Sequence, residues 1–261
     1  MAKFIDRTEE RNINSFGSEM IITRYKNNKD IDVYFPKYDW TAFNVQYGQF
    51  TKGEIKCPYE PRLCNIGYQG EGSYESEFGK NYNKAYRAWR NMIERCYNKK
   101  IQSRQKAYIG CTVCDEWHNF QNFAEWFYDN YYEIPGEVMY LDKDILTKGN
   151  KIYSPDNCTF VSNRINVLFI KHDKDRGEYP IGVYHEKTRK NKLVAQCQIY
   201  ENGKIKRKFL GYFELDQVEE AFLSYKTFKE AYIKSVANEY KDLIPQSLYD
   251  AMYNYEVDYD D

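Results

Sequence analysis

The sequence predicts an α+β protein of several modules, and three observations support this fold class. Residues 1–75 contain short alternating strands separated by polar turns. Within residues 80–170, two short apolar segments flank a glycine turn and precede an apolar-periodic helix. Residues 178–245 combine three alternating strands with one long amphipathic helix. We therefore expect a β-rich N-terminal unit, a two-strand-and-helix centre, a C-terminal three-stranded antiparallel sheet packed on one helix, and an acidic tail at residues 246–261.

The charge of the chain is unevenly distributed, although the formal net charge of its 261 residues is only −1. Residues 80–106 contain nine Lys or Arg and one acid, and residues 186–208 contain eight Lys or Arg and two acids. Two local cationic segments suit a protein that follows phosphate groups. Solvated helix and hairpin faces give the same pattern, so this alternative stays open.

The sequence also bears on the compartment. No apolar run approaches the length of a membrane span, and the first residues, MAKFIDRTEERNIN, lack an apolar signal region. We expect a cytoplasmic protein without membrane contact. In a reducing compartment its seven cysteines are more typical of thiols or metal ligands than of disulfides.

Three strands are expected in the first unit, at Met20–Tyr25, Ile31–Phe35 and Phe43–Tyr47. The order of residues from Asn14 to Ile55, Asn-x-Phe-Gly-x-x-Met-x-Ile and later Phe-x-x-Gly-x-Ile, resembles a small module at the front of phage endonucleases that is associated with DNA binding. A small barrel-like packing module explains the same residues equally well.

An amphipathic helix is predicted from Asn83 to about Asn98. Its apolar side is formed by Ala85, Trp89, Met92, Ile93 and Cys96. Its polar side carries Lys84, Arg87, Arg90 and Arg95. A second helix, rich in aromatic residues, is expected at Phe120–Tyr132, where the rings recur at core spacing.

The centre of the chain predicts a hairpin followed by a helix. Strands are expected at Leu141–Ile145 and Lys151–Tyr153 around a turn at Lys148-Gly149-Asn150. Ser154 is a suitable N-cap and Pro155 suits the first position of the helix.

This stretch resembles the HNH (ββα-metal) nucleases of phages and mobile elements. The resemblance is carried by Leu-Asp-basic, Gly-Asn and Tyr-Ser-Pro-Asp-Asn-Cys-x-Phe-Val, and upstream by Trp-x-x-Met-x-x-Arg-Cys-Tyr and Val-Cys-x-x-Trp. It implies that Asp142 and Asn157 hold Mg²⁺ or another divalent metal. It also places Lys143 where the family has its general-base His. Double-stranded DNA is then the substrate, in the cytoplasm of a phage-infected bacterial cell.

The lysine at the base position leaves catalysis open. A general base works best with a pKa near the operating pH, and the neighbouring Asp142 and Asp144 favour the protonated form of Lys143. Lys143 therefore suits phosphate binding better than proton abstraction. Tyr153, His118 or a water on a second metal could act instead. Two interpretations follow: an HNH-type endonuclease that nicks or cuts DNA, or a degenerate HNH scaffold that binds DNA without cutting it.

Four cysteines of this region form a candidate structural zinc site. Cys111 and Cys114 form a C-x-x-C turn, which can present two thiolates to one tetrahedral ion. Membership of the same motif region makes Cys96 and Cys158 the candidates for the other two ligands. Buried thiols are the alternative. The cysteines outside this candidate site are Cys57, Cys64 and Cys197.

The C-terminal unit is expected to form strands at Ile181–Tyr184, Leu193–Tyr200 and Lys204–Tyr212, followed by a helix from Asp216 to about Tyr240. The Asn-Gly pair at 202–203 predicts a tight hairpin turn. The C-terminal unit resembles the APETALA-type, or ethylene-response-factor, DNA-binding domain, which lays its sheet in the major groove. The resemblance is carried by Gly-Val-Tyr, Lys-Leu-Val-Ala-Gln-Cys-Gln-Ile and Phe-Leu-Gly-Tyr-Phe.

The predicted DNA contacts combine basic residues, for phosphate, with two glutamines that are two apart on one strand and offer amide groups to base edges. They are Arg87, Arg90, Arg95, Lys187, Arg189, Lys190, Lys192, Gln196, Gln198, Lys206, Arg207 and Lys208. An alternative class is a phage protein that binds a host protein, which the Tyr-rich composition and the acidic tail allow. We expect that tail, YDAMYNYEVDYDD, to be a solvated end or an interaction tail. The sequence gives neither the recognition site nor the oligomeric state.

Overall fold

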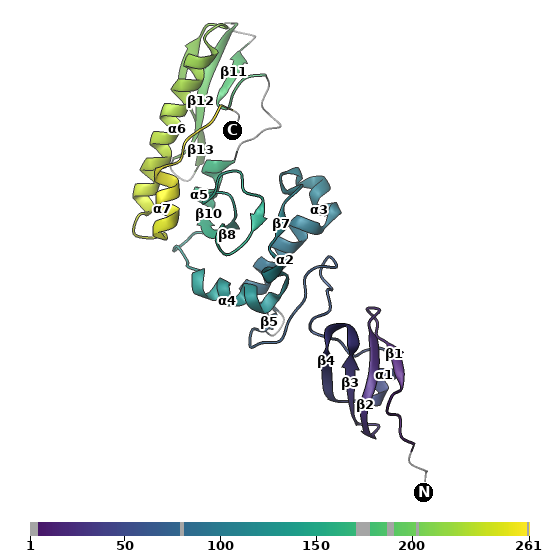
Figure 1. Ribbon diagram of the computed structural model, residues 1–261. Coiled ribbons are helices and arrows are strands. Elements are labelled where there is room, and N and C mark those ends of the chain that lie inside the picture. The colour runs from purple at the N-terminus through teal and green to yellow at the C-terminus, as the bar shows by residue number, and fades with distance from the viewer. Residues whose placement is uncertain (1–4, 79–80, 171–177, 187–190, 202–203, 260) are drawn as a thin grey trace. The chain divides into compact units, whose positions relative to one another are not determined.

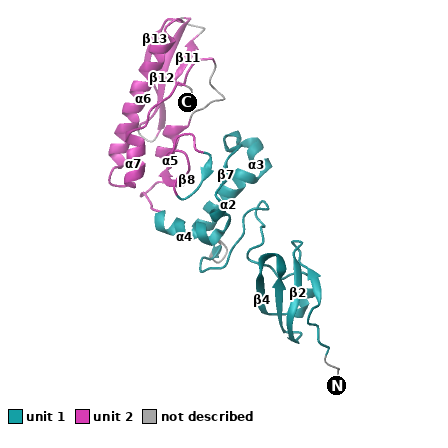
Figure 2. Cartoon of the chain, in the orientation of Figure 1, with its two compact units in different colours: residues 1–130, 151–155 teal, residues 131–150, 156–261 magenta. Residues whose placement is uncertain are grey.

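The computed structural model describes residues 5–78, 81–170, 178–186, 191–201, 204–259 and 261. It divides into two compact units, residues 1–130 with 151–155 and residues 131–150 with 156–261 (Figure 2). The fold is mixed α+β, as predicted. In the described part of the chain, no helix has the combination of length and apolar character that crossing a membrane requires.

The N-terminal sheet has four antiparallel strands in the order β1-β2-β3-β4 (Figure 1). Its elements are β1 (Arg11–Ile13), β2 (Glu19–Asn27), β3 (Asp30–Phe35), the 3₁₀ turn η1 (Pro36–Tyr38), β4 (Trp40–Val45) and α1 (Tyr47–Thr51). The first two predicted strands are confirmed. The third begins and ends earlier than predicted, because the chain turns into α1 at Tyr47. The core of this sheet is formed by Met20, Ile22, Ile31, Val33, Phe35, Phe50 and Cys57.

The rest of the first unit is mainly helical. It contains β5 (Glu77–Phe78), β6 (Asn81–Tyr82), α2 (Lys84–Tyr97), α3 (Lys99–Arg104), η2 (Lys106–Tyr108), β7 (Thr112–Val113), η3 (Asp115–His118), α4 (Phe120–Asn130) and β9 (Ile152–Tyr153). The predicted helices are confirmed, with the Asn83 side chain accepting a hydrogen bond from the amide of Ala85 as the N-cap of α2. All five residues of its predicted apolar side are buried.

The central hairpin prediction is wrong. The strand β8 (Met139–Asp142) pairs with β10 (Thr159–Ser162) in antiparallel register, so that Asp142 faces Thr159. The predicted second strand, β9, instead pairs in parallel with β7. Two residues of strand are too few to specify a partner by local turn chemistry, so a more distant segment competes successfully.

The predicted helix start at Ser154 is also wrong. Residues 155–157 form a turn, and the buried run Thr-Phe-Val-Ser that follows is the strand β10, because its β-branched and aromatic residues fit a sheet buried on both faces. The helix α5 (Asn163–Asn166) begins later, and the hydroxyl of Ser162 accepts a hydrogen bond from the amide of Ile165. It continues into η4 (Val167–Phe169).

The C-terminal sheet is antiparallel, with the order β11-β12-β13, and packs against α6, as predicted. Its elements are β11 (Val183–Glu186), β12 (Lys192–Glu201), β13 (Lys204–Phe213), α6 (Val218–Tyr240) and α7 (Gln246–Tyr253) (Figure 1). The predicted Asn-Gly turn at 202–203 lies outside the described residues.

The acidic tail is not a solvated end. Leu248 and Met252 of α7 are fully buried, and Val257 is 97% buried beyond it. Leu248 and Met252 share a core with Val161 of β10 and with Val236 of α6. The apolar residues between the acids explain the correction, since burying them stabilises the segment against the rest of the unit.

Candidate metal centre and nucleic-acid interface

The predicted functional residues of the second unit lie in two places. Asp142, Lys143 and Asn157 lie at one end of the β8–β10 pair, in and beside the loop that joins these strands. The predicted contacts Lys192, Gln196, Gln198, Lys206, Arg207 and Lys208 lie on the C-terminal sheet.

Asp142 ends β8 and presents its two carboxylate oxygens differently. Its Oδ1 accepts hydrogen bonds of 2.9 Å from the backbone amides of Asp144 and Ile145. Among the described residues, Oδ2 accepts no hydrogen bond. Burial, and then the charge of Asp144, raise the pKa of Asp142 to about 6. The carboxylate is thus oriented by the backbone and is still ionised at neutral pH, with one oxygen left for a cation.

Asn157 lies in the turn before β10, on the same end of the strand pair as Asp142. Thr147 Oγ1 donates a hydrogen bond of 3.1 Å to Asn157 Oδ1. The family resemblance placed Asn157 on a helix. The structure places it in a turn instead, where this hydrogen bond holds its amide oxygen against the loop. The turn of that loop falls at the predicted residues Lys148, Gly149 and Asn150, where Gly149 has a φ of +79°.

Lys143 is 92% buried, next to the candidate metal ligand. Its Nζ lies 3.3 Å from Asp144 Oδ2, and its carbonyl accepts a hydrogen bond from Asn150 Nδ2 at 2.7 Å. The ammonium group is therefore paired inside the loop. This geometry suits a residue that fixes the loop, with little surface to offer a phosphate.

The two other candidate bases lie in the first unit. Tyr153 is 98% buried on β9. His118 Nε2 lies 3.5 Å from the hydroxyl of Tyr97, and its Nδ1 lies 3.7 Å from Asp115 Oδ1. His118 thus has two polar neighbours of its own at the end of η3.

Lys148 is a residue that the sequence did not single out. Its Nζ donates to the carbonyl of Glu256 at 2.8 Å and to Oδ2 of Asp258 and of Asp261, both at 2.6 Å. Its ammonium also lies 5.0 Å from the ring centroid of Tyr255. These contacts fasten the acidic segment after α7 to the β8–β10 loop. No local sequence signal could have found them, because the partners are more than a hundred residues apart.

The cysteines of the candidate zinc site are divided between the units. Cys96, Cys111 and Cys114 belong to the first unit and Cys158 to the second. Across the described ranges, no group of three or more His, Cys, Asp or Glu side chains is placed to hold a metal ion. Burial raises the pKa of Cys114, which favours the thiol over the thiolate that zinc binds. Zinc stays a prediction, which elemental analysis of the purified protein tests.

The C-terminal sheet has one face toward α6 and one open face. Leu193 and Cys197 of β12 pack with Ala221 and Tyr225 of α6. Because side chains alternate along a strand, Gln196 and Gln198 point to the other face. The prediction that these two glutamines share a face is confirmed.

The strand pairing extends this open face to β13. Gln198 is directly opposite Arg207, and Gln196 is opposite Phe209. Directly opposed residues of an antiparallel pair lie on the same face, so Arg207 and Phe209 join the glutamines. Val194 pairs with Tyr212 and Tyr184, which adds two exposed tyrosines to the same surface. We call Tyr184, Gln196, Gln198, Arg207, Phe209 and Tyr212 the open-face residues.

Two of the other predicted contacts of this sheet, Lys206 and Lys208, lie on the opposite face. Lys206 is opposite Ile199 and Lys208 is opposite Cys197, so both lie on the face that carries α6. Lys206 also pairs with Glu201 at 2.6 Å. Lys192 pairs with Glu214 at the edge of the open face.

The remaining predicted contacts are in two groups. Lys187, Arg189 and Lys190 lie outside the described residues. On α2, Arg90 Nε bonds Glu94 at 2.9 Å and the Arg95 guanidinium lies 5.2 Å from the ring of Tyr108, while Arg87 is exposed. Arg87 is thus exposed, whereas Arg90 and Arg95 each contact a neighbouring side chain.

Comparisons of this chain with protein-family models, with curated proteins and with solved structures gave no match. The function has to be argued from the chain's own residues.

Proposed function

We propose that this protein binds double-stranded DNA through the open-face residues of the C-terminal sheet. One observation carries the proposal: Gln196, Gln198 and Arg207 project from the same exposed side of two paired strands. Glutamine amides and an arginine guanidinium are the groups that pair with adenine and guanine edges in the major groove. Exposed aromatic rings beside them can contact the thymine methyl group and the sugars.

The size of the surface also supports the proposal. The strands β12 and β13 each have ten residues, a length of roughly 33 Å. The major groove is about 12 Å wide and admits a two-stranded ribbon. The two paired strands β12 and β13, which carry the glutamines and Arg207, are therefore of a size that the groove admits, with α6 on the outer side.

Binding is tested with a labelled pool of 20-base-pair duplexes at several salt concentrations, by mobility shift or fluorescence anisotropy. We expect submicromolar affinity at low salt, with the logarithm of the binding constant falling linearly with the logarithm of the salt concentration. Absence of binding at low salt would contradict the proposal and favour the alternative of a protein that binds a host protein.

A second function, metal-dependent phosphodiester cleavage, is favoured by one specific observation. Asp142 is held by two backbone amides on Oδ1 at the end of β8, and Asn157 lies in the turn before the paired strand β10. Mg²⁺ prefers such oxygen ligands, usually one or two from the protein with water and phosphate completing the shell. When bound, the metal would stabilise charge that develops on the phosphate. Asp142 and Asn157 would hold it, while Lys143 and Asp144 keep the loop in place.

Cleavage is tested with supercoiled plasmid and Mg²⁺ or Mn²⁺. The wild type should yield nicked or linear product, and an Asp142→Ala/Asn157→Ala variant should not. Glu137→Gln, an acid outside the loop, is the matched control. If both proteins shift the plasmid and neither changes it, the alternative of a binding-only HNH scaffold is correct and the cleavage proposal is refuted.

A further inference from the structure

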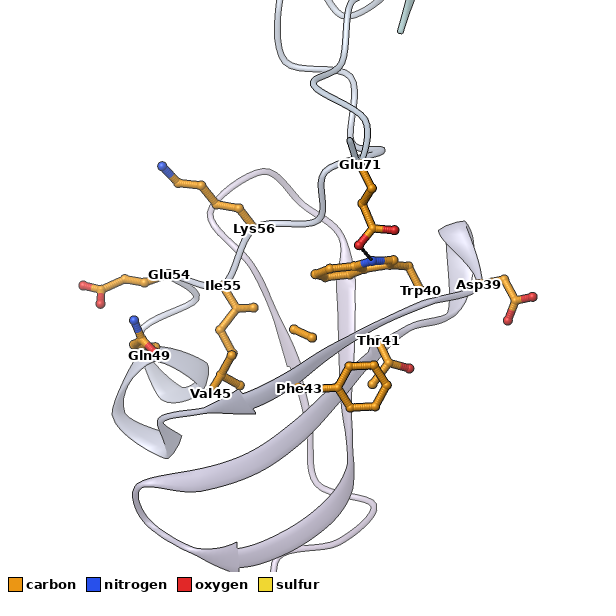
Figure 3. A pocket seen from close by; sticks show the side chains of 11 residues that line it. Asp39, Trp40, Thr41, Phe43, Val45, Gln49, Glu54, Ile55, Lys56 and Glu71 are labelled. Carbon is orange, nitrogen blue, oxygen red and sulfur yellow. Dashed lines mark hydrogen bonds between the residues drawn. The ribbon is translucent and has the colours of Figure 1, made fainter. Parts of the chain in front are cut away.

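A hollow of about 670 Å³ lies beside β4 in the N-terminal unit, far in the sequence from both regions described above (Figure 3). It is lined by β4, by the segment after α1 and by Glu71, which follows later in the chain. The lining residues include Trp40, Thr41, Phe43, Ile55, Lys56 and Glu71.

The hollow runs along the edge of the sheet. Successive residues of a strand point to opposite faces, and the hollow is lined by four successive residues, Trp40 to Phe43. The surface that they share is therefore the strand's edge. β4 is the last strand in the order β1-β2-β3-β4 of the described sheet, so this edge can accept another strand.

Two aromatic side chains line this groove, one fixed by a hydrogen bond and one largely exposed. The Trp40 indole Nε1 donates a hydrogen bond of 2.9 Å to Glu71 Oε1, and its ring centroid lies 5.6 Å from that of Phe35. Phe43 is 68% exposed, the highest value among the large apolar residues of the described chain. A fixed indole and an exposed phenyl ring offer contact area at a low cost in side-chain entropy.

The groove is acidic. Asp39, Glu54 and Glu71 line it, against the single ammonium of Lys56. A second hollow of about 850 Å³ shares Trp40, Lys56 and Glu71 with it and adds more carboxylates than cations. Glu71 accepts one hydrogen bond on each oxygen, from Trp40 and from the hydroxyl of Tyr59, and so keeps acceptor capacity for a cationic ligand. Phosphate is disfavoured here by charge.

We propose that this groove binds an extended, Lys- or Arg-containing segment of a partner protein, which adds to the sheet as a strand beside β4. Main-chain hydrogen bonds to the strand edge would give affinity, as in other cases of strand addition. Alternate side chains of the segment would give specificity: a cationic one reaches the face of Trp40 and the carboxylate of Glu71, and an apolar one packs on Phe43. This function is separate from DNA binding and does not rest on it.

The test uses the full chain and two labelled ten-residue peptides, one of alternating Lys and Val and one of alternating Glu and Val. Fluorescence anisotropy should show the Lys-Val peptide bound at least tenfold more tightly. Glu71→Gln, which keeps the shape of the side chain, and Phe43→Ala, which removes an exposed ring, should each weaken binding at least fivefold. Glu125→Gln, an exposed acid on α4, should leave binding unchanged.

Three results would overturn the proposal. They are equal binding of the two peptides, no binding of either, and equal effects of the Glu71→Gln and Glu125→Gln substitutions. Binding of a labelled DNA duplex to the Arg207→Ala variant that is lost on further Phe43→Ala substitution would assign the groove to nucleic acid instead. Circular dichroism of each variant checks that the fold is retained.

Discussion

The N-terminal and C-terminal sheets are both antiparallel, yet they expose different parts of themselves. The first leaves the edge strand β4 beside a groove that contains carboxylates and aromatic rings. The second leaves a whole face open, with amides, a guanidinium and aromatic rings. Sheet topology alone therefore does not decide the partner. The position of the covering helix and the charge of the exposed side chains differ between the two sheets, and our proposals of a cationic peptide at one sheet and DNA at the other rest on these differences.

The largest expected effect concerns α7, the segment that follows the helix covering the C-terminal sheet. Leu248 of α7 is fully buried in the core that α6 shares with β10, whereas Leu243, just before α7, is 49% exposed. We expect Leu248→Ala to lower the free energy of unfolding by roughly 3 kcal/mol and Leu243→Ala by less than about 0.5 kcal/mol. Urea denaturation measures both. Equal losses would contradict the docking of the segment after α6.

The second-largest expected effect comes from adding negative charge to the open face of the C-terminal sheet. Gln196→Glu/Gln198→Glu places two carboxylates on the open face and should weaken DNA binding about 100-fold, by roughly 3 kcal/mol. Lys206→Gln/Lys208→Gln changes the net charge by the same amount on the opposite face. It should weaken binding less than tenfold. If the two variants lose equal affinity, only the total charge matters and the comparison of the two sheets fails.

The smallest effect concerns a buried charge beneath each sheet. Asp32 is paired with Arg24 by hydrogen bonds of 2.6 and 2.8 Å. Lys229 of α6 is 92% buried, and burial lowers its pKa, an effect that the nearby Cys197 thiol opposes. Because the folded state disfavours the charged ammonium, the stability cost is present at pH 7 and is relieved as the pH rises through the lowered pKa toward 10.5.

Lys229→Met should therefore stabilise the protein by about 1 kcal/mol at pH 7. The gain should be smaller at pH 10, because the lowered pKa lets the wild-type amine lose its proton at a lower pH in the folded than in the unfolded chain. Urea denaturation at the two pH values measures it. A gain that is the same at both, or a loss at pH 7, would show that the ammonium is not the source of the cost.

The elements that sequence reasoning placed correctly are those with long periodic patterns. The helix α2 has five buried residues at helical spacing, so local pattern and tertiary burial agree there, and β12 and β13 are long strands of ten residues each. The central hairpin failed because β9 has only two residues, and its partner β7 lies about forty residues earlier in the chain. Short strands carry too little local information to choose between near and distant partners.

For the candidate sites, too, the sequence could predict some features and not others. Lys206, Arg207 and Lys208 were all predicted as DNA contacts, and alternation along β12 was enough only to group Gln196 with Gln198. It could not say which group faces solvent, because that depends on where α6 packs. The family resemblance singled out Asp142 and Asn157 as candidate metal ligands. It could not reveal that Lys143 is buried against Asp144, or that Lys148 binds the acidic segment, since both depend on tertiary contacts.

The most direct measurement of the central claim compares two adjacent cations on β13. Arg207 lies on the open face and Lys208 on the face of α6, so alanine at either position removes one positive charge from the same strand. We predict that Arg207→Ala weakens binding of a 20-base-pair duplex about tenfold, as expected for loss of a base or phosphate contact, and that Lys208→Ala weakens it less than threefold. Equal losses, or a larger loss for Lys208→Ala, would contradict the assignment of the open face as the DNA-binding surface.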